Sequence, residues 1–232
     1  MTQKTRMTGF IVAAAILASC GGSGSTSSND TSQQRVKNAA LTSVPTTCTD
    51  DGDCRVGDIG PGGGTVFYVG SSKINKSGDK YPGGKYMEFV DSDDNWATTF
   101  LCSSNIAGTE TGVGAGAKNT ALLKEKCPSK LQSRPINVAW DSVRNKKSDW
   151  FLPSNDELNL ICRFSRGQST ESNEKCNAKL TPLPGFNFTA PMWSSSNFGA
   201  QLQYVVAFKD GGSTTGNKSN DKYRFLLVRA FG

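Results

Sequence analysis

The chain of 232 residues contains no histidine. This absence excludes a Ser-His-Asp triad and a His-ligated zinc site, because both need an imidazole side chain. The apolar run at residues 9–18 is also short, about half of the roughly 20 residues that a membrane-spanning helix needs. The absence of histidine therefore excludes most hydrolase mechanisms. The short apolar run is typical of an export signal rather than of a membrane-spanning helix.

Glycine, cysteine and a moderate excess of positive charge are what the chain does contain. It has 25 glycines, 7 cysteines, and 26 Lys+Arg against 20 Asp+Glu, with 36% hydrophobic residues. This hydrophobic fraction suffices for a folded domain, and so many cysteines are typical of an oxidising compartment. The counts favour a loop-rich, disulfide-bonded extracytoplasmic domain over a cytosolic enzyme.

The N-terminal region predicts a signal peptide over residues 1–19. Lys4 and Arg6 precede the apolar run, which ends in the letters LASC at residues 17–20. LASC resembles the lipobox of bacterial lipoproteins, in which the cysteine is lipidated and becomes the first residue of the mature chain. The resemblance implies that Cys20 carries lipid and anchors an extracytoplasmic, surface-exposed domain to a membrane of the cell envelope. An ordinary secretory signal, with Cys20 buried or paired, is the alternative.

Residues 20–47 are predicted to form a flexible tether. They are rich in Ser, Thr, Gly and Asn and have few large apolar side chains that could offset the entropy of ordering. A random coil of this length reaches roughly 30 Å. One domain is predicted over residues 48–232, since no internal repeat and no second linker follows the tether.

Six cysteines remain in this domain once Cys20 is set aside, and an even number in an exported chain implies three disulfides. Pairing in sequence order closes the shortest loops and is the favoured connectivity, although other pairings stay open. It joins Cys48 to Cys54, Cys102 to Cys127 and Cys162 to Cys176. A metal–thiolate site is disfavoured because no pair has CxxC spacing.

Runs rich in β-branched and aromatic residues predict four strands, at 65–69, 85–90, 203–208 and 223–230. A short helix is expected at 120–127, and a second after Pro135, where apolar residues recur at helical spacing. The strongest helix start lies at Ser154, since Ser154 and Glu157 form an SxxE capping box. Cys162 on the inner face of this helix is placed to pin it to the following loop.

Six short strings stand in order along the domain: GDIGPGGGTVFYV (57–69), GKYMEFV (84–90), GVGAGAKNT (112–120), SDWFLPSNDEL (148–158), WSSS (193–196) and VRAF (228–231). Together they resemble a bacterial domain family of unknown function that also forms the C-terminal domain of Legionella collagen-like adhesins. The resemblance covers about residues 55–232. It implies an α+β, C-type-lectin-like fold with a central, partly antiparallel sheet, two or three helices and long glycine-rich loops.

Most of these strings are interpreted as scaffold. Trp193 and the three serines after it predict a core strand whose hydroxyls bond neighbouring backbone. Arg229 is expected to pair with Glu157 or another acid inside the fold. The strings GPGGG and GVGAG are interpreted as turns, because neither has the strand, helix and lysine of a nucleotide-binding loop.

Positive charge is concentrated in residues 118–149, which hold eight basic and three acidic residues. This segment is a candidate polyanion-binding site, and a solvated helix face is the alternative. The residues assigned to the site are Lys124, Lys126, Arg144, Lys146 and Lys147.

Acidic residues form two other groups, which are candidates for Ca²⁺ because that ion prefers oxygen ligands. They are Asp50, Asp51 and Asp53, and Asp91, Asp93, Asp94 and Asn95. Neither group has the pattern of an EF-hand loop or of a sugar-binding C-type lectin, so ordinary surface acid is favoured. No residue is assigned as a metal ligand, and no cofactor other than Ca²⁺ is considered.

The favoured function is a lipid-anchored, non-catalytic binding or adhesion module for a glycan, a polyanion or a protein, with no nucleic-acid partner. An accessory envelope lipoprotein that binds another envelope protein is the alternative. An oxidative enzyme related to the formylglycine-generating enzymes, which share the lectin-like fold, is least favoured. Their reactive cysteine pair lies near the C-terminus, and this chain has no cysteine after Cys176.

Overall fold

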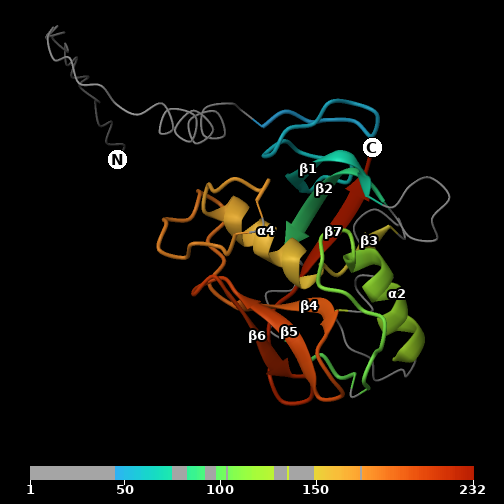
Figure 1. Ribbon diagram of the computed structural model, residues 1–232. Helices are drawn as coiled ribbons and strands as arrows, with labels where there is room; N and C mark the ends of the chain where they lie inside the picture. Colours follow the sequence, from blue (N-terminus) through green and yellow to red (C-terminus); the bar gives the residue numbers. More distant parts are fainter. Residues whose placement is uncertain are drawn as a thin grey trace, which may run out of the picture.

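The computed structural model describes residues 45–74, 83–91, 98–102, 104–127, 135, 149–172 and 174–232 (Figure 1). Within these residues lie two helices, α2 (Gly116–Lys126) and α4 (Asn155–Ser165), and two antiparallel sheets. The first sheet has the order β1 (Thr65–Ile74), β2 (Gly84–Asp91), β7 (Leu226–Phe231) and β3 (Trp150–Phe151). The second has the order β4 (Pro191–Asn197), β5 (Leu202–Ala207) and β6 (Gly212–Asn217). The predicted α+β class is confirmed.

The strands fall into two sheets where the sequence predicts one central sheet. In the described part of the chain the link between them is a single bridge that joins Met192 on β4 to Arg224, just before β7. Toward β7 the next N–H of β4, that of Ser195, donates to the carbonyl of Pro153 at 2.7 Å, so the pairing does not continue along β7.

The four predicted strands are confirmed with shifted ends. β1 ends at Ile74 rather than at residue 69, and the C-terminal strand starts at Leu226 rather than at residue 223. Tyr223 pairs with Thr98 instead, and this bridge draws the loop that contains Thr98 onto the core.

The capping box at the start of α4 is confirmed. The Ser154 hydroxyl accepts the N–H of Glu157 at 3.2 Å, and the Glu157 carboxylate accepts the N–H of Ser154 at 2.7 Å. Leu158, Ile161 and Cys162 are buried on the inner face as the spacing predicts. Burying a large apolar side chain stabilises the fold by about 1.5–3 kcal/mol, so this face holds α4 against the sheets.

The helix predicted at 120–127 begins four residues earlier, at Gly116, so part of GVGAG is helix rather than turn. The reason is a long-range cap. The N–H groups of Gly114 and Gly116 donate to the Glu157 carboxylate at 2.8 and 3.3 Å, while Ala115 provides no side-chain cap. One buried carboxylate thus satisfies the first turns of both helices. The helix predicted after Pro135 lies outside the described residues.

Three apolar clusters lie in the interior of the described structure, and the two larger ones hold the helices. One includes Leu158 and Val206 and lies where α4 packs on β1, β4 and β5. The other includes Phe100, Leu123 and Trp193 and lies where α2 packs on β3 and β4. Both helices therefore bridge the two sheets.

The predicted disulfide pairing is confirmed. Cys48 and Cys54, Cys102 and Cys127, and Cys162 and Cys176 are bonded, with Cα–Cα distances of 5.5, 5.8 and 5.8 Å. Each closed loop removes conformational entropy from the unfolded chain and typically contributes about 2–4 kcal/mol. In the part of the chain that the structure describes, neither helix is long and apolar enough to cross a bilayer.

Two residues at the end of the predicted tether, Thr46 and Thr47, contact the folded domain. Ile59 donates its N–H to the carbonyl of Thr46, and Thr47 forms a bridge with Ile59. The Thr46 hydroxyl also donates to Asp58 at 2.8 Å. These contacts tie Thr46 and Thr47 to the folded domain, and Thr46 supplies donors that buried Asp58 needs.

Candidate binding surface

The exposed large apolar side chains of the described residues are Leu101 and Phe198, which are 49% and 54% exposed. Leu101 also has φ +52°, and no other non-glycine residue in the described ranges has a positive φ. Such a backbone costs on the order of 1 kcal/mol and persists only where the surroundings enforce it. Both features make the loops that carry Leu101 and Phe198 candidates for a binding surface.

Lys218 lies beneath these loops and is fully buried. Its ammonium donates to the carbonyls of Ser104 and Gly199 at 2.9 and 2.8 Å, and to Oδ1 of Asn197 at 2.5 Å. An ammonium has three N–H donors, so these three oxygens satisfy it completely. Burial disfavours the charge and lowers the pKa of Lys218 to about 8.

The backbone of Lys218 makes two further bonds to the same loops. Its N–H donates to the carbonyl of Gln201 at 2.9 Å, and its carbonyl accepts the N–H of Leu101 at 2.9 Å. Asn197 also donates to Oδ1 of Asn105 at 2.9 Å. We name residues 101, 102, 104, 105, 197–201 and 217–221 the loop surface, because these contacts join its three segments.

Each segment of the loop surface is anchored separately to the scaffold. The Cys102–Cys127 disulfide fixes the first to the end of α2. The ring of Phe198 packs edge-on against Tyr204 of β5, with centroids 5.3 Å apart. In the third, Asn217 Oδ1 accepts the N–H of Ser219 at 3.0 Å and closes a tight turn. Each segment therefore has a contact of its own beside those that Lys218 makes.

The exposed polar side chains of the loop surface are mostly uncharged amides and hydroxyls. They are Ser104, Asn105, Gln201, Ser219 and Asn220. The sheet β4–β5–β6 that supports them lies at the opposite end of the molecule from residues 45–60, which are blue in Figure 1. The surface thus faces away from the point where the predicted tether enters the domain.

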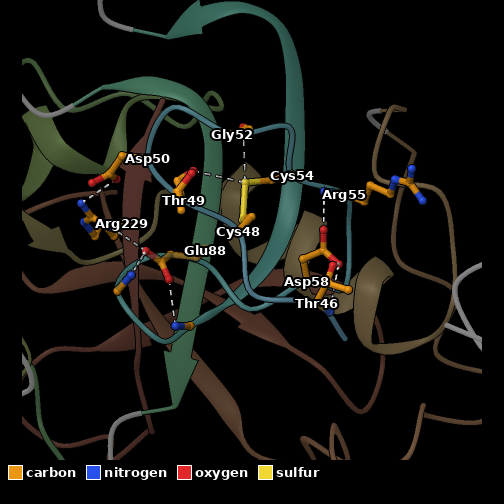
Figure 2. The surroundings of a disulfide bond; sticks show 12 residues. Thr46, Cys48, Thr49, Asp50, Gly52, Cys54, Arg55, Asp58, Glu88 and Arg229 are labelled. Atoms are coloured by element: carbon orange, nitrogen blue, oxygen red, sulfur yellow. Dashed lines mark hydrogen bonds and ion pairs between the residues drawn. A yellow bond between two sulfur atoms is a disulfide. The ribbon is translucent and has the colours of Figure 1, made fainter. Parts of the chain in front are cut away.

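The buried carboxylate of Glu88 belongs to the scaffold and is drawn in Figure 2. It accepts the N–H groups of Gly62 and Gly64 at 2.9 and 2.8 Å and the guanidinium of Arg229 at 3.0 Å. Burial raises the pKa of Glu88, while these donors oppose the rise. The glycine string GPGGG is therefore a turn that binds a carboxylate of this chain.

Arg229 pairs with three acids, none of which is Glu157. Besides Glu88, it contacts Asp149 at 2.6 Å and Asp50 at 3.1 Å. The expectation of a partner inside the fold is confirmed, and the candidate Glu157 is wrong because that carboxylate caps the helices. Asp50 lies in the Cys48–Cys54 loop, so Arg229 ties this loop to β7 (Figure 2).

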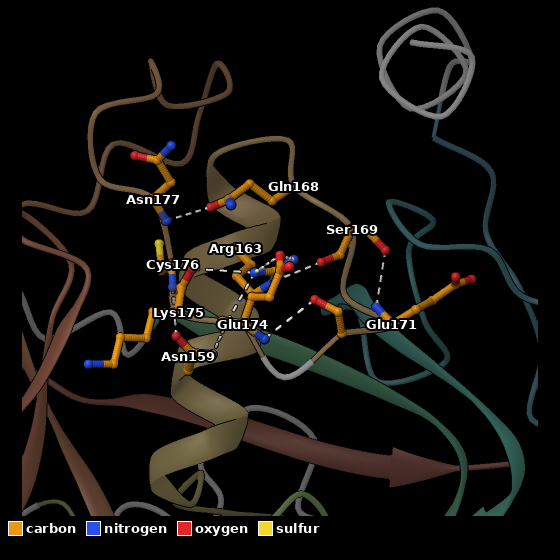
Figure 3. A network of polar contacts seen from close by, with 10 residues as sticks. Asn159, Arg163, Gln168, Ser169, Glu171, Glu174, Lys175, Cys176 and Asn177 are labelled. Atoms are coloured by element: carbon orange, nitrogen blue, oxygen red, sulfur yellow. Dashed lines mark hydrogen bonds and ion pairs between the residues drawn. The ribbon is translucent and has the colours of Figure 1, made fainter. Parts of the chain in front are cut away.

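A second buried arginine, Arg163, organises the loop after α4 (Figure 3). It donates to the carbonyls of Ser169 and Glu174 at 2.8 and 3.0 Å, and it pairs with the Glu174 carboxylate at 3.4 Å. The Cys162–Cys176 disulfide closes the same loop. The predicted structural role of Cys162 agrees with these contacts.

The core strand predicted at Trp193 is confirmed. The hydroxyl of Ser194 donates to the carbonyl of Tyr204 at 2.9 Å, and that of Ser196 donates to the carbonyl of Glu110 at 2.8 Å. The serines thus satisfy backbone acceptors in the interior, as predicted.

The structure describes only some of the basic residues that are predicted to bind polyanions. Lys124 and Lys126 lie in the last turn of α2. Lys126 pairs with Glu125 at 2.9 Å, and Lys118 pairs with Glu110. Arg144, Lys146 and Lys147 lie outside the described residues. The described part of this segment therefore carries less unpaired positive charge than the sequence suggests.

Two of the acidic residues predicted as Ca²⁺ candidates are held in ion pairs with arginines. Asp50 pairs with Arg229, and Asp91 pairs with Arg224 at 2.5 Å. Asp51 and Asp53 are exposed, and the remaining candidates, Asp93, Asp94 and Asn95, lie outside the described residues. Among the residues that are described, no three His, Cys, Asp or Glu side chains gather as a metal site would require.

A hollow of about 240 Å³ lies on another face, next to β2. Its lining includes Phe89, Phe186, Phe188 and Asp91. The three rings pack against one another with centroids 5.9 to 6.4 Å apart. They serve the core, and the carboxylate of Asp91 in the lining pairs with Arg224, so the loop surface is the better candidate for binding.

Sequence reasoning did not find Lys218, Leu101 or Phe198. The lysine stands in a polar turn sequence, NKSND, that is typical of an exposed loop.

No protein-family model matches this chain, and no curated protein is significantly similar to it in sequence. The case for a function therefore rests on the chemistry of the loop surface and on the disulfides.

Proposed function

We propose that this chain is a non-catalytic binding module, held to a membrane of the cell envelope through lipidated Cys20, and that it binds a protein partner through the loop surface. One observation carries the proposal: the two large exposed apolar side chains, Leu101 and Phe198, both project from loops that a single buried lysine holds together. Singly scattered exposed apolar residues are ordinary, so the shared attachment of these two loops to Lys218 is what supports an interaction site here.

The chemistry of the loop surface favours a protein over a polyanion. Apolar anchors surrounded by uncharged amides and hydroxyls resemble the centre and rim of a protein interface, from which charged residues are depleted. Because its loops are already fixed, the surface loses little conformational entropy on binding, which favours affinity. A partner in the same envelope and a partner on another cell both fit this chemistry.

The disulfides support the extracytoplasmic part of the proposal. All six cysteines of the domain are paired, as is typical of proteins in oxidising compartments. This pairing also counts against an oxidative enzyme, which would need free reactive thiols. The α+β architecture with two helices agrees with a C-type-lectin-like fold, which we infer from the resemblance of the sequence strings.

Site-specific photo-crosslinking in the envelope tests the proposal. A photoreactive phenylalanine analogue replaces Phe198 in the full chain, and in a control it replaces exposed Lys209 in the turn between β5 and β6. We expect a discrete protein adduct from position 198 and none from position 209. A glycan adduct, equal adducts from both positions, or no adduct from position 198 would contradict a protein partner at this surface.

The polyanion site remains a second proposal, located on the basic segment rather than on the loop surface. Reversing Lys124, Lys146 and Lys147 to Glu should abolish retention of the full chain on heparin if the segment binds polyanions. Retention equal to that of the parent would remove this candidate. Neither outcome changes what is expected of photo-crosslinking at position 198.

A further inference from the structure

We propose that Lys218 is a positioning residue whose ammonium acts as a resident cation, filling a cage of three oxygens and thereby holding the loop surface in its binding conformation. The role is the one that a bound metal ion fills in other sites built from loops. This inference rests on the proposed function for its biological meaning, while its structural content can be tested without any partner.

The cage consists of neutral oxygens from two separate segments of the chain. Ser104 and Gly199 provide backbone carbonyls and Asn197 provides its amide oxygen, all within 2.9 Å of the Lys218 nitrogen. Carbonyl and amide oxygens are also the ligands that hard cations select. The ammonium therefore joins the loop at Ser104 to the loop between β4 and β5.

Stability alone does not account for a lysine at this position. Burying an ammonium carries a large desolvation cost, and buried ionic groups can often be replaced by apolar residues of similar volume with little loss or even a gain in stability. The cost is tolerated here, and the loops above Lys218 include strained Leu101. A role in fixing these loops explains both the buried charge and the strain that it helps to enforce.

Removing the ammonium should affect the loops and the whole domain differently. In a Lys218→Met variant the three oxygens lose their donor, and a buried acceptor without a partner is costly unless it reaches water. The loops would have to open to hydrate these oxygens. The substitution also removes a buried charge from the interior. The free energy of global unfolding should therefore not decrease, even though the loops open more often.

Hydrogen exchange of the full chain, measured together with thermal unfolding, tests this difference. In Lys218→Met we expect exchange at the amides of Leu101 and Gly199 to accelerate by about tenfold or more, with an unchanged or raised midpoint. Exposed Lys222, four residues along the chain, provides the matched control Lys222→Met, which should leave both measurements unchanged. Unchanged exchange at the two amides, or acceleration throughout the domain with a lowered midpoint, would overturn the proposal.

Chemical rescue tests whether the oxygens form a cation site. In Lys218→Ala the cage is left without its ammonium, so ammonium or potassium chloride should restore slow exchange at Leu101 and Gly199. Tetramethylammonium chloride at the same ionic strength should not, because this cation is too large and cannot donate hydrogen bonds. Rescue by none of the three salts, or equally by all of them, would overturn the role of a resident cation.

Photo-crosslinking from position 198 then connects the cage to binding. Introducing Lys218→Met should reduce the adduct yield by about tenfold if the loops must be held in place to bind. If the parent forms no adduct, the proposed function fails while the exchange results still test the cage. If the adduct persists in full despite accelerated exchange, the positioning role fails while the proposed function stands.

Discussion

Replacing Ser154 by alanine should destabilise the domain by removing two buried hydrogen bonds at the start of α4. Its hydroxyl accepts the N–H of Glu157 at 3.2 Å and donates to the carbonyl of Gly112 at 2.8 Å, and Ser154 is fully buried. The second bond ties α4 to the segment before α2. Water cannot replace either bond without opening the junction of the two helices.

The expected cost follows from these two bonds. Loss of an N-cap hydroxyl costs about 0.5–2 kcal/mol. Loss of the bond to Gly112 adds about 0.5–1.5 kcal/mol, at the lower end because that carbonyl also accepts the N–H of Ala115 at 3.2 Å. The total for Ser154→Ala is about 2 kcal/mol, which lowers the thermal midpoint of a domain of this size by about 4–8 °C.

Urea unfolding, followed by tryptophan fluorescence, measures the loss, with Ser213→Ala as the matched control. The Ser213 hydroxyl is exposed and bonds only the Asn155 side chain in the described structure, so its removal should change stability by less than about 0.5 kcal/mol. Equal midpoints for the parent and Ser154→Ala would refute the reasoning. Equal losses for the two variants would show that burial of the hydroxyl is not the cause.

Three further predictions concern charge, disulfides and anchoring. Burial lowers the pKa of Lys218 from its ordinary 10.5 to about 8, so the unfolded chain binds more protons between these values. Stability should therefore rise with pH across this window, by at most about 3 kcal/mol, and a similar rise in Lys218→Met would contradict that assignment. Intact-mass measurement should show six hydrogens fewer in the unreduced domain than in the reduced one, and a smaller difference would reveal free thiols. Cys20→Ala should move the chain from the detergent phase to the aqueous phase, and unchanged partitioning would exclude lipidation.

Local signals in the sequence predicted the parts of the fold that local physics determines. The SxxE capping box located the start of α4, since both partners lie within one turn. Runs rich in β-branched and aromatic residues located four of the strands, and the short loops between consecutive cysteines located the disulfides. Each of these predictions depends on residues that are close in the chain.

The errors come from contacts between distant residues. The start of α2 was missed because its cap is Glu157, which lies 41 positions beyond Gly116. The partner of Arg229 was assigned to the wrong acid for a similar reason, since Glu88 is 141 positions away. No pattern of neighbouring residues records which carboxylate reaches which donor.

The candidate site was missed for the same physical reason. Lys218 occupies a polar turn, and a solvated lysine is the usual interpretation of such a sequence. Its burial depends on Ser104, which is 114 positions away, and on the β4–β5 turn. Leu101 and Phe198 carry no signal either, because an exposed and a buried apolar residue look alike when no periodicity surrounds them.

The placement of the loop surface also bears on which partners it can reach. The chain enters the domain near Thr46, where the Cys48–Cys54 disulfide and the pairing of Asp50 with Arg229 fix its first segment to the first sheet. The loop surface lies on the second sheet, at the other end of the molecule (Figure 1). A tether that reaches roughly 30 Å would lift this domain clear of the lipid headgroups. The exposed Phe198 would then meet molecules beyond the anchoring membrane rather than its lipids, which is why the crosslinking experiment looks for a protein adduct.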